Sequence, residues 1–548
     1  MAKLILGPLL RYVDETDATI WVETDTSCEV EVLGHRSRTF HVEGHHYAVV
    51  CITGLKPAHT YLYTVLLDTQ LVWPELDSAF PPSVIRTIDP GQTVRLVFGS
   101  CRVTLPHEPP YTLSKDEDER GREVDALYAL ALRMRREPQA NWPHVLLFLG
   151  DQIYADEVSP STGEFIRSRR KPECPPGLEV ADFEEYTHLY LDAWGDPVLR
   201  WLLSTVSTLM IFDDHDMHDD WNISEAWVAT MRSKPWWDER IVGGFMSYWI
   251  YQHLGNLSPT DLEEDTQFKR VQKMDDGGEF LRAFALRADR EVQGSQWSYC
   301  RDFGTTRLVV LDARAGRVVS GGRRQMIDEE EWRWVERQAT GDCDHLLIAT
   351  SVPFLLAPAI HYLEAWNEAV CAGVWGDAAA KQGERLRQAV DLEHWAAFEK
   401  SFHRLKELLR AVGAGERGRA PRSIVILSGD VHHAYLAQAA FKPEAAVQSA
   451  IYQAVCSPVR NSLDVKERYG FRTAWSKPVE LIAQALALTV GIKRPDVRWH
   501  LLHDRPWFHN QIASVELSGP KAQFRLEKAL PVHASDPRLE VLIDHRLA

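Results

Sequence analysis

The stretch VLLFLGDQIY, residues 145–154, sets an apolar run directly before a glycine, an aspartate and a tyrosine. The run has the length of a strand, and its unbroken hydrophobicity is typical of a strand buried on both faces. Similar runs alternate with helical stretches along the chain, which predicts an α/β fold. The further predicted strands are residues 94–99, 209–212, 308–311, 346–350 and 424–428. The predicted helices are residues 124–136, 186–203, 330–338 and 395–412, and residues 512–517 and 522–526 predict a hairpin.

Polar clusters follow five of these runs, at the points where the strands are expected to end. They read FGSCR at 98–102, GDQIY at 150–154, DDHD at 213–216, DAR at 312–314 and SGDVHH at 428–433. Because ligands of α/β proteins bind outside the carboxyl ends of the strands, we expect these side chains to converge. Buried carboxylates without partners are costly, so bound cations are the simplest explanation of such a cluster.

Each cluster has an ordinary structural alternative when it is taken alone. Asp151 could be a turn aspartate, DDHD could cap a helix, His432 or His433 could be a hydrogen-bonded core histidine, and Cys101 could be an inert buried thiol. Four clusters that each follow an apolar run directly, in this order, favour the metal site.

The first 90 residues follow another pattern. Short alternating runs at 18–22, 47–52 and 61–65 are separated by turn residues and show no helical period, which predicts a small all-β sandwich. The segment GLKPAHTYLY at 54–63 resembles the corner of a fibronectin type III domain, with another small β domain as the alternative. Residues 91–548 then form the second predicted domain. Two of its stretches, 155–182 and 253–296, are predicted to be long surface insertions.

Composition excludes several classes of protein. The chain has 548 residues, 61 Lys and Arg against 78 Asp and Glu, and a formal net charge of -17. Such a surface repels phosphate backbones, so long nucleic acids are not expected as partners. The eight cysteines form no CxxC pair, which indicates a reducing compartment. Without an export signal or a run long enough to span a membrane, the expected location is the cytoplasm.

The order and content of the clusters resemble the binuclear metallophosphatase superfamily, and more closely the alkaline phosphatase D (PhoD-like) family. The motifs that carry the resemblance also include SVPF at 351–354 and extend over essentially the whole chain. The resemblance implies an α-β-β-α sandwich and an enzyme that hydrolyses small phosphate esters. Hydroxide held by the metals would attack phosphorus, and His215 would protonate the leaving group.

The resemblance also implies the ligands. Asp151 would bridge two metals, and Cys101, Tyr154 and His432 would complete a first site that holds Fe(III) in this family. Asp214 and Asp430 would serve a second site, usually calcium. Zinc or manganese is the alternative. Arg102 and Arg314 are predicted to grip phosphate oxygens, with ion pairs to neighbouring carboxylates as the alternative.

Three departures from the family pattern affect these expectations. Family members often carry Asn a few residues after Asp-Asp-His, where this chain has Asp219 and Asp220, with Asn222 further on. The matching position for one calcium ligand in EHWAAF, residues 393–398, is Ala396, so one calcium site is expected to be missing or rebuilt. The twin-arginine export signal typical of the family is absent from the sequence. Two other functions stay open: another binuclear phosphodiesterase, acting on nucleotides or phospholipids, and a catalytically inactive protein that binds metal and phosphate.

Overall fold

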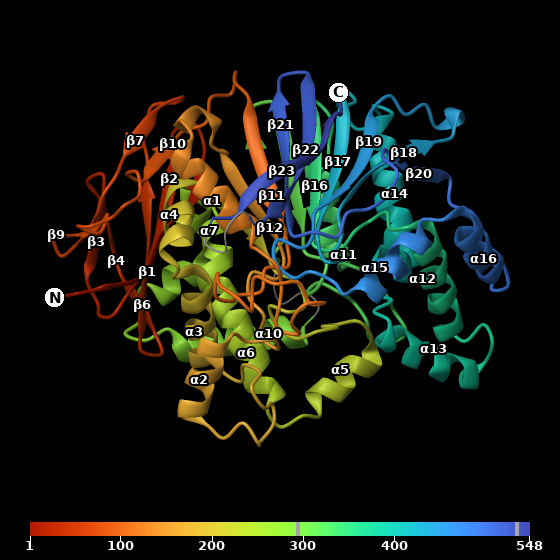
Figure 1. Ribbon diagram of the computed structural model, residues 1–548, viewed down its shortest axis with the longest axis horizontal. Helices are drawn as coiled ribbons and strands as arrows, with labels where there is room; N and C mark the ends of the chain where they lie inside the picture. The colour runs from red at the N-terminus through yellow and green to blue at the C-terminus, as the bar shows by residue number, and fades with distance from the viewer. Residues whose placement is uncertain (292–295, 532–535) are drawn as a thin grey trace.

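Two mixed β-sheets stacked face to face form the centre of the computed structural model, which describes residues 1–291, 296–531 and 536–548 (Figure 1). The first sheet has the order β13-β12-β11-β21-β22-β23 and the second the order β14-β15-β16-β17-β19-β18-β20. The strands of the first sheet are β11 (Val94–Gly99), β12 (Val145–Leu149), β13 (Ser207–Ile211), β21 (Gln511–Ser518), β22 (Lys521–Leu530) and β23 (Arg538–Arg546). Those of the second are β14 (Tyr299–Phe303), β15 (Thr306–Leu311), β16 (His345–Thr350), β17 (Ser423–Ser428), β18 (Tyr435–Phe441), β19 (Ala450–Val455) and β20 (Val497–Leu501). Each of the six predicted strands and the predicted hairpin is therefore present.

The alternation of side chains along β16 shows why the sheets are sandwiched between helices. Leu347 and Ala349 pack into the core between the two sheets. Leu346 and Ile348 point the other way, into a second core under α11 (Glu329–Gln338) and α14 (Glu399–Gly413). A strand with apolar residues on both faces needs a cover on both sides. The α-β-β-α sandwich predicted from the sequence is confirmed.

The helices differ from the prediction at two places. Residues 186–203 form two helices, α3 (Phe183–Trp194) and α4 (Pro197–Thr205), because Pro197 lacks the N–H that would continue the first. Asp196 caps α4 by accepting hydrogen bonds from the amides of Val198 and Leu199. The predicted helix 395–412 starts as a short 3₁₀ turn over Trp395–Ala397 before α14. The helix predicted at 124–136 is α1 (Ala126–Arg136).

The two stretches predicted as surface insertions contain helices. The first includes α2 (Pro160–Arg169). The second includes α7 (Leu254–Asn256), α8 (Pro259–Glu264), α9 (Thr266–Val271) and α10 (Gly278–Arg290), and its residues 292–295 lie outside the described ranges. The remaining helices of this half are α5 (Glu225–Arg232), α6 (Trp237–Ser247) and a π-helical turn over Tyr248–His253. Within the described ranges no helix is both long and apolar enough to cross a membrane.

The N-terminal region is all-β, as predicted, and lies at one end of the molecule in Figure 1. One sheet holds β1 (Leu4–Val13), β2 (Ala18–Thr24), β6 (His45–Ile52) and β5 (Phe40–Val42). The other holds β4 (His35–Arg38), β3 (Glu29–Val32), β8 (Val65–Leu67) and β9 (Gln70–Trp73), and β7 (Thr60–Leu62) pairs with β10 (Val84–Arg86). Its likeness to a fibronectin type III domain stays a prediction.

A buried arginine joins this β region to the rest of the chain. Arg11 on β1 is fully buried and donates hydrogen bonds to the carbonyl oxygens of Thr208 at 3.3 Å, Tyr251 at 2.5 Å and Gln252 at 2.8 Å. Because a charged group buried in this way is costly to leave unpaired, the two regions are held in one arrangement.

Candidate metal centre

The ends of β11, β12, β13 and β17 meet in one place, although they come from both sheets. Ser100, just after β11, accepts a hydrogen bond from the amide of Asp430, after β17, at 2.9 Å. A Cβ on Gly429 would lie 2.1 Å from the Ser100 hydroxyl oxygen, so only glycine allows the two segments to approach so closely. The polar clusters that follow the strands therefore share one site, as the sequence predicted.

The backbone at this site is held in an uncommon conformation. Cys101, Asp151, Asp430 and His432 have φ angles of 56°, 54°, 67° and 48°. Side chains with a Cβ are rarely found in this left-handed region, where each costs of order 1–3 kcal/mol. Four such residues close together make this a candidate functional site.

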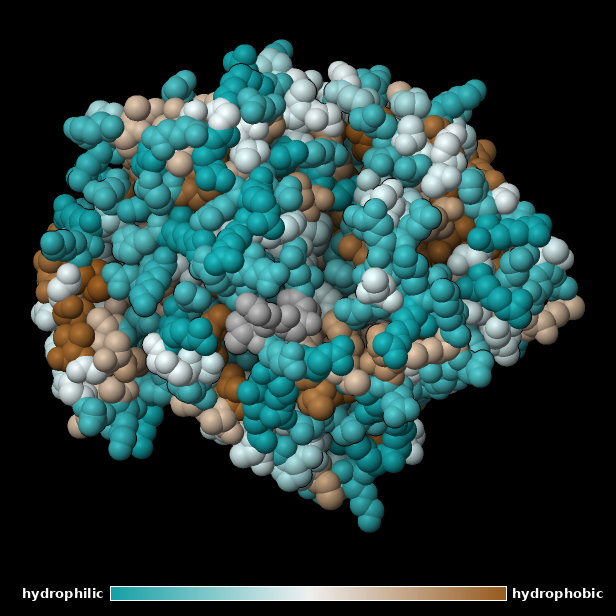
Figure 2. Space-filling view, turned by 180° about the vertical axis from the view of Figure 1, so that it is seen from behind, coloured by the Kyte–Doolittle hydropathy of each residue, from teal (hydrophilic) through white to brown (hydrophobic). Residues whose placement is uncertain are grey.

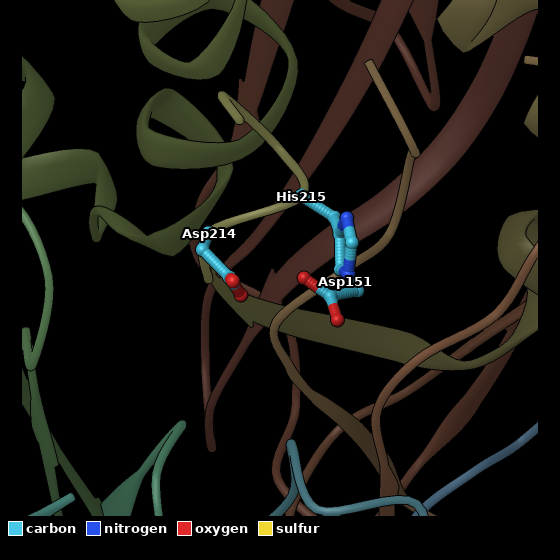
Figure 3. Close-up of side chains that lie close together, drawn as sticks. All are labelled: Asp151, Asp214 and His215. Carbon is cyan, nitrogen blue, oxygen red and sulfur yellow. The ribbon is translucent and has the colours of Figure 1, made fainter. Parts of the chain in front are cut away.

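Carboxylates and a histidine converge at the centre of the site (Figure 3). One ligand atom from each of Asp151, Asp214 and His215 lies within 4.8 Å of the others, and the same holds for Asp213, Asp214 and Asp430. The Oδ1 atom of Asp151 is buried and has no hydrogen-bond partner in the structure. Because a buried carboxylate oxygen needs a partner, this atom fits a bound cation.

Tyr154 lies beside Asp151, Cys101 packs with Tyr154 in one small cluster, and His432 lines the same cavity as Asp151. The Tyr154 hydroxyl lies 3.4 Å from Asp151 Oδ2 and accepts a hydrogen bond from Asn461 Nδ2 at 3.3 Å. Burial raises the pKa values of the Asp151 carboxyl, the Tyr154 phenol and the Cys101 thiol well above their ordinary ranges. Such groups lose their protons readily only beside a cation.

The imidazole of His432 is neutral at physiological pH. Burial, reinforced by His215, lowers its pKa to about 3. Neutral imidazole is the form that binds metals, and His432 lines the same cavity as Asp151 and His215. The donor set around Asp151 thus fits a metal ion.

Arg314 lies among the carboxylates of the predicted second site. Its guanidinium is fully buried and donates to Asp213 and Glu393, and to Oδ1 of both Asp214 and Asp430 at 3.1 Å. It is therefore engaged in ion pairs rather than free to bind a phosphate. The pKa of Asp430 lies well below its ordinary value, because His394 and Arg314 outweigh the effect of burial.

The remaining oxygens of these two carboxylates also have protein donors. Oδ2 of Asp430 lies 2.9 Å from His394 Nε2, and Oδ2 of Asp214 accepts from the amide of Asp220 at 3.1 Å. Any cation at the second position would have to share these oxygens with Arg314 and His394.

Arg102 is turned away from the cluster. Its guanidinium donates to Asp125 Oδ2 at 2.8 Å and to the carbonyl oxygen of Ala193 at 3.1 Å. The structure therefore realises the ion-pair alternative for both arginines.

His215 is held by a carboxylate that the sequence analysis did not single out. Its Nδ1 lies 2.9 Å from Asp156 Oδ1, and its ring stacks on Tyr154 with a centroid distance of 4.5 Å. Burial alone would lower the pKa of His215, but the carboxylates of Asp156 and Asp214 outweigh it and raise the pKa well above the ordinary value. These carboxylates therefore favour the protonated form of the imidazole.

Other contributing residues were also missed. His394 is held between Glu364, 2.6 Å from Nδ1, and Asp430, and the Nε2 of Gln252 donates to Asp216 Oδ1 at 3.0 Å. Gln252 lies in the π-helical turn, a feature that often accompanies functional sites. For Asp156 a signal existed, since it stands two residues after Tyr154 at the end of GDQIYAD.

Comparison with known protein families decides what this site belongs to. Residues 126–505 match the family model described as PhoD-like phosphatase, which is more than half of the chain. The chain belongs to the PhoD-like phosphatase family. Residues 1–85 match a separate family, a domain of unknown function. The family and the fold together make this chain a phosphatase-type hydrolase.

Two solved structures are similar to this chain, and the first of them supports the fold. A structure described as "Structure of PhoD" is similar with a TM-score of 0.56 and 11% sequence identity, over 99% of this chain and 92% of that chain. A purple acid phosphatase, PPD1 from yellow lupin (Lupinus luteus) seeds, has a TM-score of 0.48 and 10% identity, over 97% of this chain and 73% of that chain. No curated protein matches the sequence.

Proposed function

We propose that this PhoD-like phosphatase hydrolyses small phosphate mono- or diesters at the strand-end site, with His215 as the proton donor. The observation that carries the proposal is the His215–Asp156 pair beside the carboxylates of Asp151 and Asp214. When water attacks phosphorus and the ester P–O bond breaks, the leaving oxygen needs a proton. A histidine fixed by a carboxylate at Nδ1 supplies it from Nε2.

Cys101, Asp151, Tyr154 and His432 would hold one metal ion. Their phenol, thiol and carboxyl groups suit Fe(III), with zinc or manganese as the alternative. A bound metal polarises the phosphoryl oxygen and lowers the pKa of a water molecule. Asp214 and Asp430 face a second position, where calcium is the family's usual ion.

We assign the phosphate to neither Arg102 nor Arg314. Arg102 is paired with Asp125, and Arg314 orients Asp214 and Asp430 from behind. In this proposal Arg314 is a positioning residue, because it acts through the carboxylates that it touches.

The proposal is tested by measuring release of 4-nitrophenol from 4-nitrophenyl phosphate and bis(4-nitrophenyl) phosphate. The purified protein is loaded in turn with iron, calcium, zinc and manganese, and its metal content is measured in parallel. Turnover of either ester that depends on bound metal is expected. Metal and phosphate binding without turnover of any ester would instead favour a non-catalytic binding protein.

A further inference from the structure

The cavity in front of the candidate metal centre has two chemically different walls. It has a volume of about 370 Å³, and one wall carries Asp151, Asp214, His215, Asp430 and His432. The apolar part of the lining, here called the apolar wall, is formed by Leu356, Ile360, Leu363, Val390, Leu392, Val431, Leu463 and Phe471.

Three side chains of the apolar wall lie on helices outside the central sheets. Ile360 and Leu363 lie on α12 (Pro358–Cys371), and Phe471 lies on α15 (Val465–Ala474), in the connection between β19 and β20. Figure 1 shows these two helices side by side, and residues of α12 and α15 are in contact. These three side chains are half-buried, so part of each faces the cavity. They are therefore placed to contact a bound molecule.

Leu356 and Val431 connect the apolar wall to a small hydrophobic cluster. Both are buried in one hydrophobic cluster, against which Ile360 packs. Because Val431 lies between Asp430 and His432 in the chain, the apolar wall begins directly beside the candidate metal ligands. The substituent of a phosphate ester bound at the candidate metal centre would therefore contact the apolar wall directly.

The charge of the lining limits what can bind there. Among the described residues that line this cavity none is a lysine or arginine. Besides His394, which is held between Glu364 and Asp430, the remaining charged lining residues are Asp219, Asp391, Glu393 and Glu467. A substrate with further phosphate or carboxylate groups would be repelled by Asp219, Asp391 and Glu467, whereas Glu393 is paired with Arg314. An uncharged apolar group would instead be removed from water.

We propose that this cavity binds the apolar alkyl or aryl group of a phosphate ester, with Ile360, Leu363 and Phe471 as specificity-determining residues. This inference rests on the proposed function and names its substrate class. Each methylene removed from water strengthens binding about three- to fivefold until the cavity is filled.

Esters of this kind occur free in solution or in a bilayer. The surface near the cavity carries exposed apolar side chains that could contact a bilayer. On α16 (Lys477–Leu488), which packs on α12, Leu481, Ile482 and Leu488 are 48%, 70% and 56% exposed. In Figure 2 hydrophobic side chains gather at the left edge of the view. This edge is the one where α16 lies, at the right of Figure 1. Vesicles therefore belong in the test.

The first experiment measures binding without turnover. Isothermal titration calorimetry of the metal-loaded protein with methyl-, butyl- and hexylphosphonate should give a dissociation constant that falls about three- to fivefold per methylene. In Phe471→Asn and Leu363→Asn this dependence should largely disappear while methylphosphonate binding is kept. The matched control is Tyr469→Asn, which alters a side chain on the same helix that is 71% exposed and outside the cavity.

The second experiment measures kcat/KM for methyl, butyl and hexyl 4-nitrophenyl phosphate. A rise with chain length that Phe471→Asn abolishes supports the inference. Turnover of the methyl ester without any dependence on chain length, in rates and in phosphonate affinities, overturns it and leaves the proposed function intact. If none of the three esters is hydrolysed, the result contradicts the proposed function. The dependence of phosphonate affinity on chain length then decides the present inference.

Phosphatidylcholine vesicles distinguish the two sources. If a bilayer presents the ester, the vesicles carry the protein into the pellet and Ile482→Asp releases it. If the ester is free in solution, the protein stays in the supernatant. The dependence on phosphonate chain length is expected in both cases, and its absence overturns the inference in both.

Discussion

Arg314 and Asp430 lie 3.1 Å apart, with the guanidinium completely buried and the carboxylate at the end of β17. The same guanidinium also contacts Asp213, Asp214 and Glu393. One arginine thus offsets much of the negative charge of four carboxylates that come from three distant parts of the sequence. Arg314 therefore neutralises the carboxylates that are predicted to form the second metal site.

Replacing Arg314 with methionine should destabilise the fold by about 3–5 kcal/mol, because four buried carboxylates lose their shared partner. Calcium should restore part of this loss in Arg314→Met and change the wild type less, since the freed oxygens can then bind the ion. Urea unfolding with and without calcium measures both effects. Arg307→Met, which removes a half-buried arginine paired with Asp302, is the control and should cost about 1 kcal/mol or less. If Arg314→Met unfolds like the wild type, the neutralising role is wrong.

Replacing His215 with alanine should lower kcat by about 10²–10⁴-fold and leave the metal content unchanged. The histidine is held by Asp156, so Asp156→Asn should lower kcat too and shift the basic limb of its pH profile to lower pH, because His215 loses the carboxylate that raises its pKa. Rates across pH and elemental analysis of the same samples test both. His403→Ala, on the outer face of α14, is the matched control. Loss of metal from His215→Ala would make His215 a ligand instead.

Much of the fold could be predicted from the sequence because buried strands leave an unambiguous pattern. The runs at 145–149 and 424–428 are apolar at every position but the last serine of the second, and the motifs that follow them mark the strand ends. Residues 186–203 were predicted as one helix, although Gly195, Asp196 and Pro197 contain the signal for a break. The helical periodicity on both sides outweighed this local signal in the prediction.

The partners of the charged side chains could not be predicted in the same way. Arg314 is adjacent in sequence to a strand end, but whether it reaches a phosphate or four carboxylates depends on packing between segments that are 79 and 116 residues further along. His394 lay inside the segment matched to a calcium-binding motif, and its contact with Asp430 depends on how α12 and the following loop pack. Such contacts follow from tertiary structure rather than from local pattern.

Replacing Asp151 with asparagine should remove most of the bound metal and the activity together. Its Oδ1 is buried and without a hydrogen-bond partner, which makes this atom the proposed metal ligand. An asparagine amide would lack the negative charge that binds the cation. Elemental analysis after dialysis, alongside rates with a 4-nitrophenyl ester, measures both quantities. Asp302→Asn at the surface is the control, and Asp151→Asn with full metal content and full activity would exclude Asp151 as a ligand.

His45 should make the docking of the N-terminal β region depend on pH. This histidine on β6 lies 2.9 Å from both Glu23 and Glu184, and Glu184 belongs to α3 of the other region. Burial lowers its pKa, but the hydrogen bonds to Glu184 and Glu23 outweigh burial and raise the pKa to about 9. Because the pKa is higher in the folded than in the unfolded state, near 6.5, the contribution to stability is complete below about pH 6.5 and is lost as pH rises through about 9.

The variant His45→Gln isolates this contribution. The difference in free energy of unfolding between wild type and His45→Gln should be largest at pH 6, up to about 3 kcal/mol, and should shrink toward zero by about pH 10. Urea unfolding at a series of pH values between 6 and 10 measures it, with His35→Gln on the outer hairpin as the control. A difference that stays constant over this range would mean that His45 stabilises the contact between the two regions by packing alone, since only the protonated imidazole donates to both carboxylates at once.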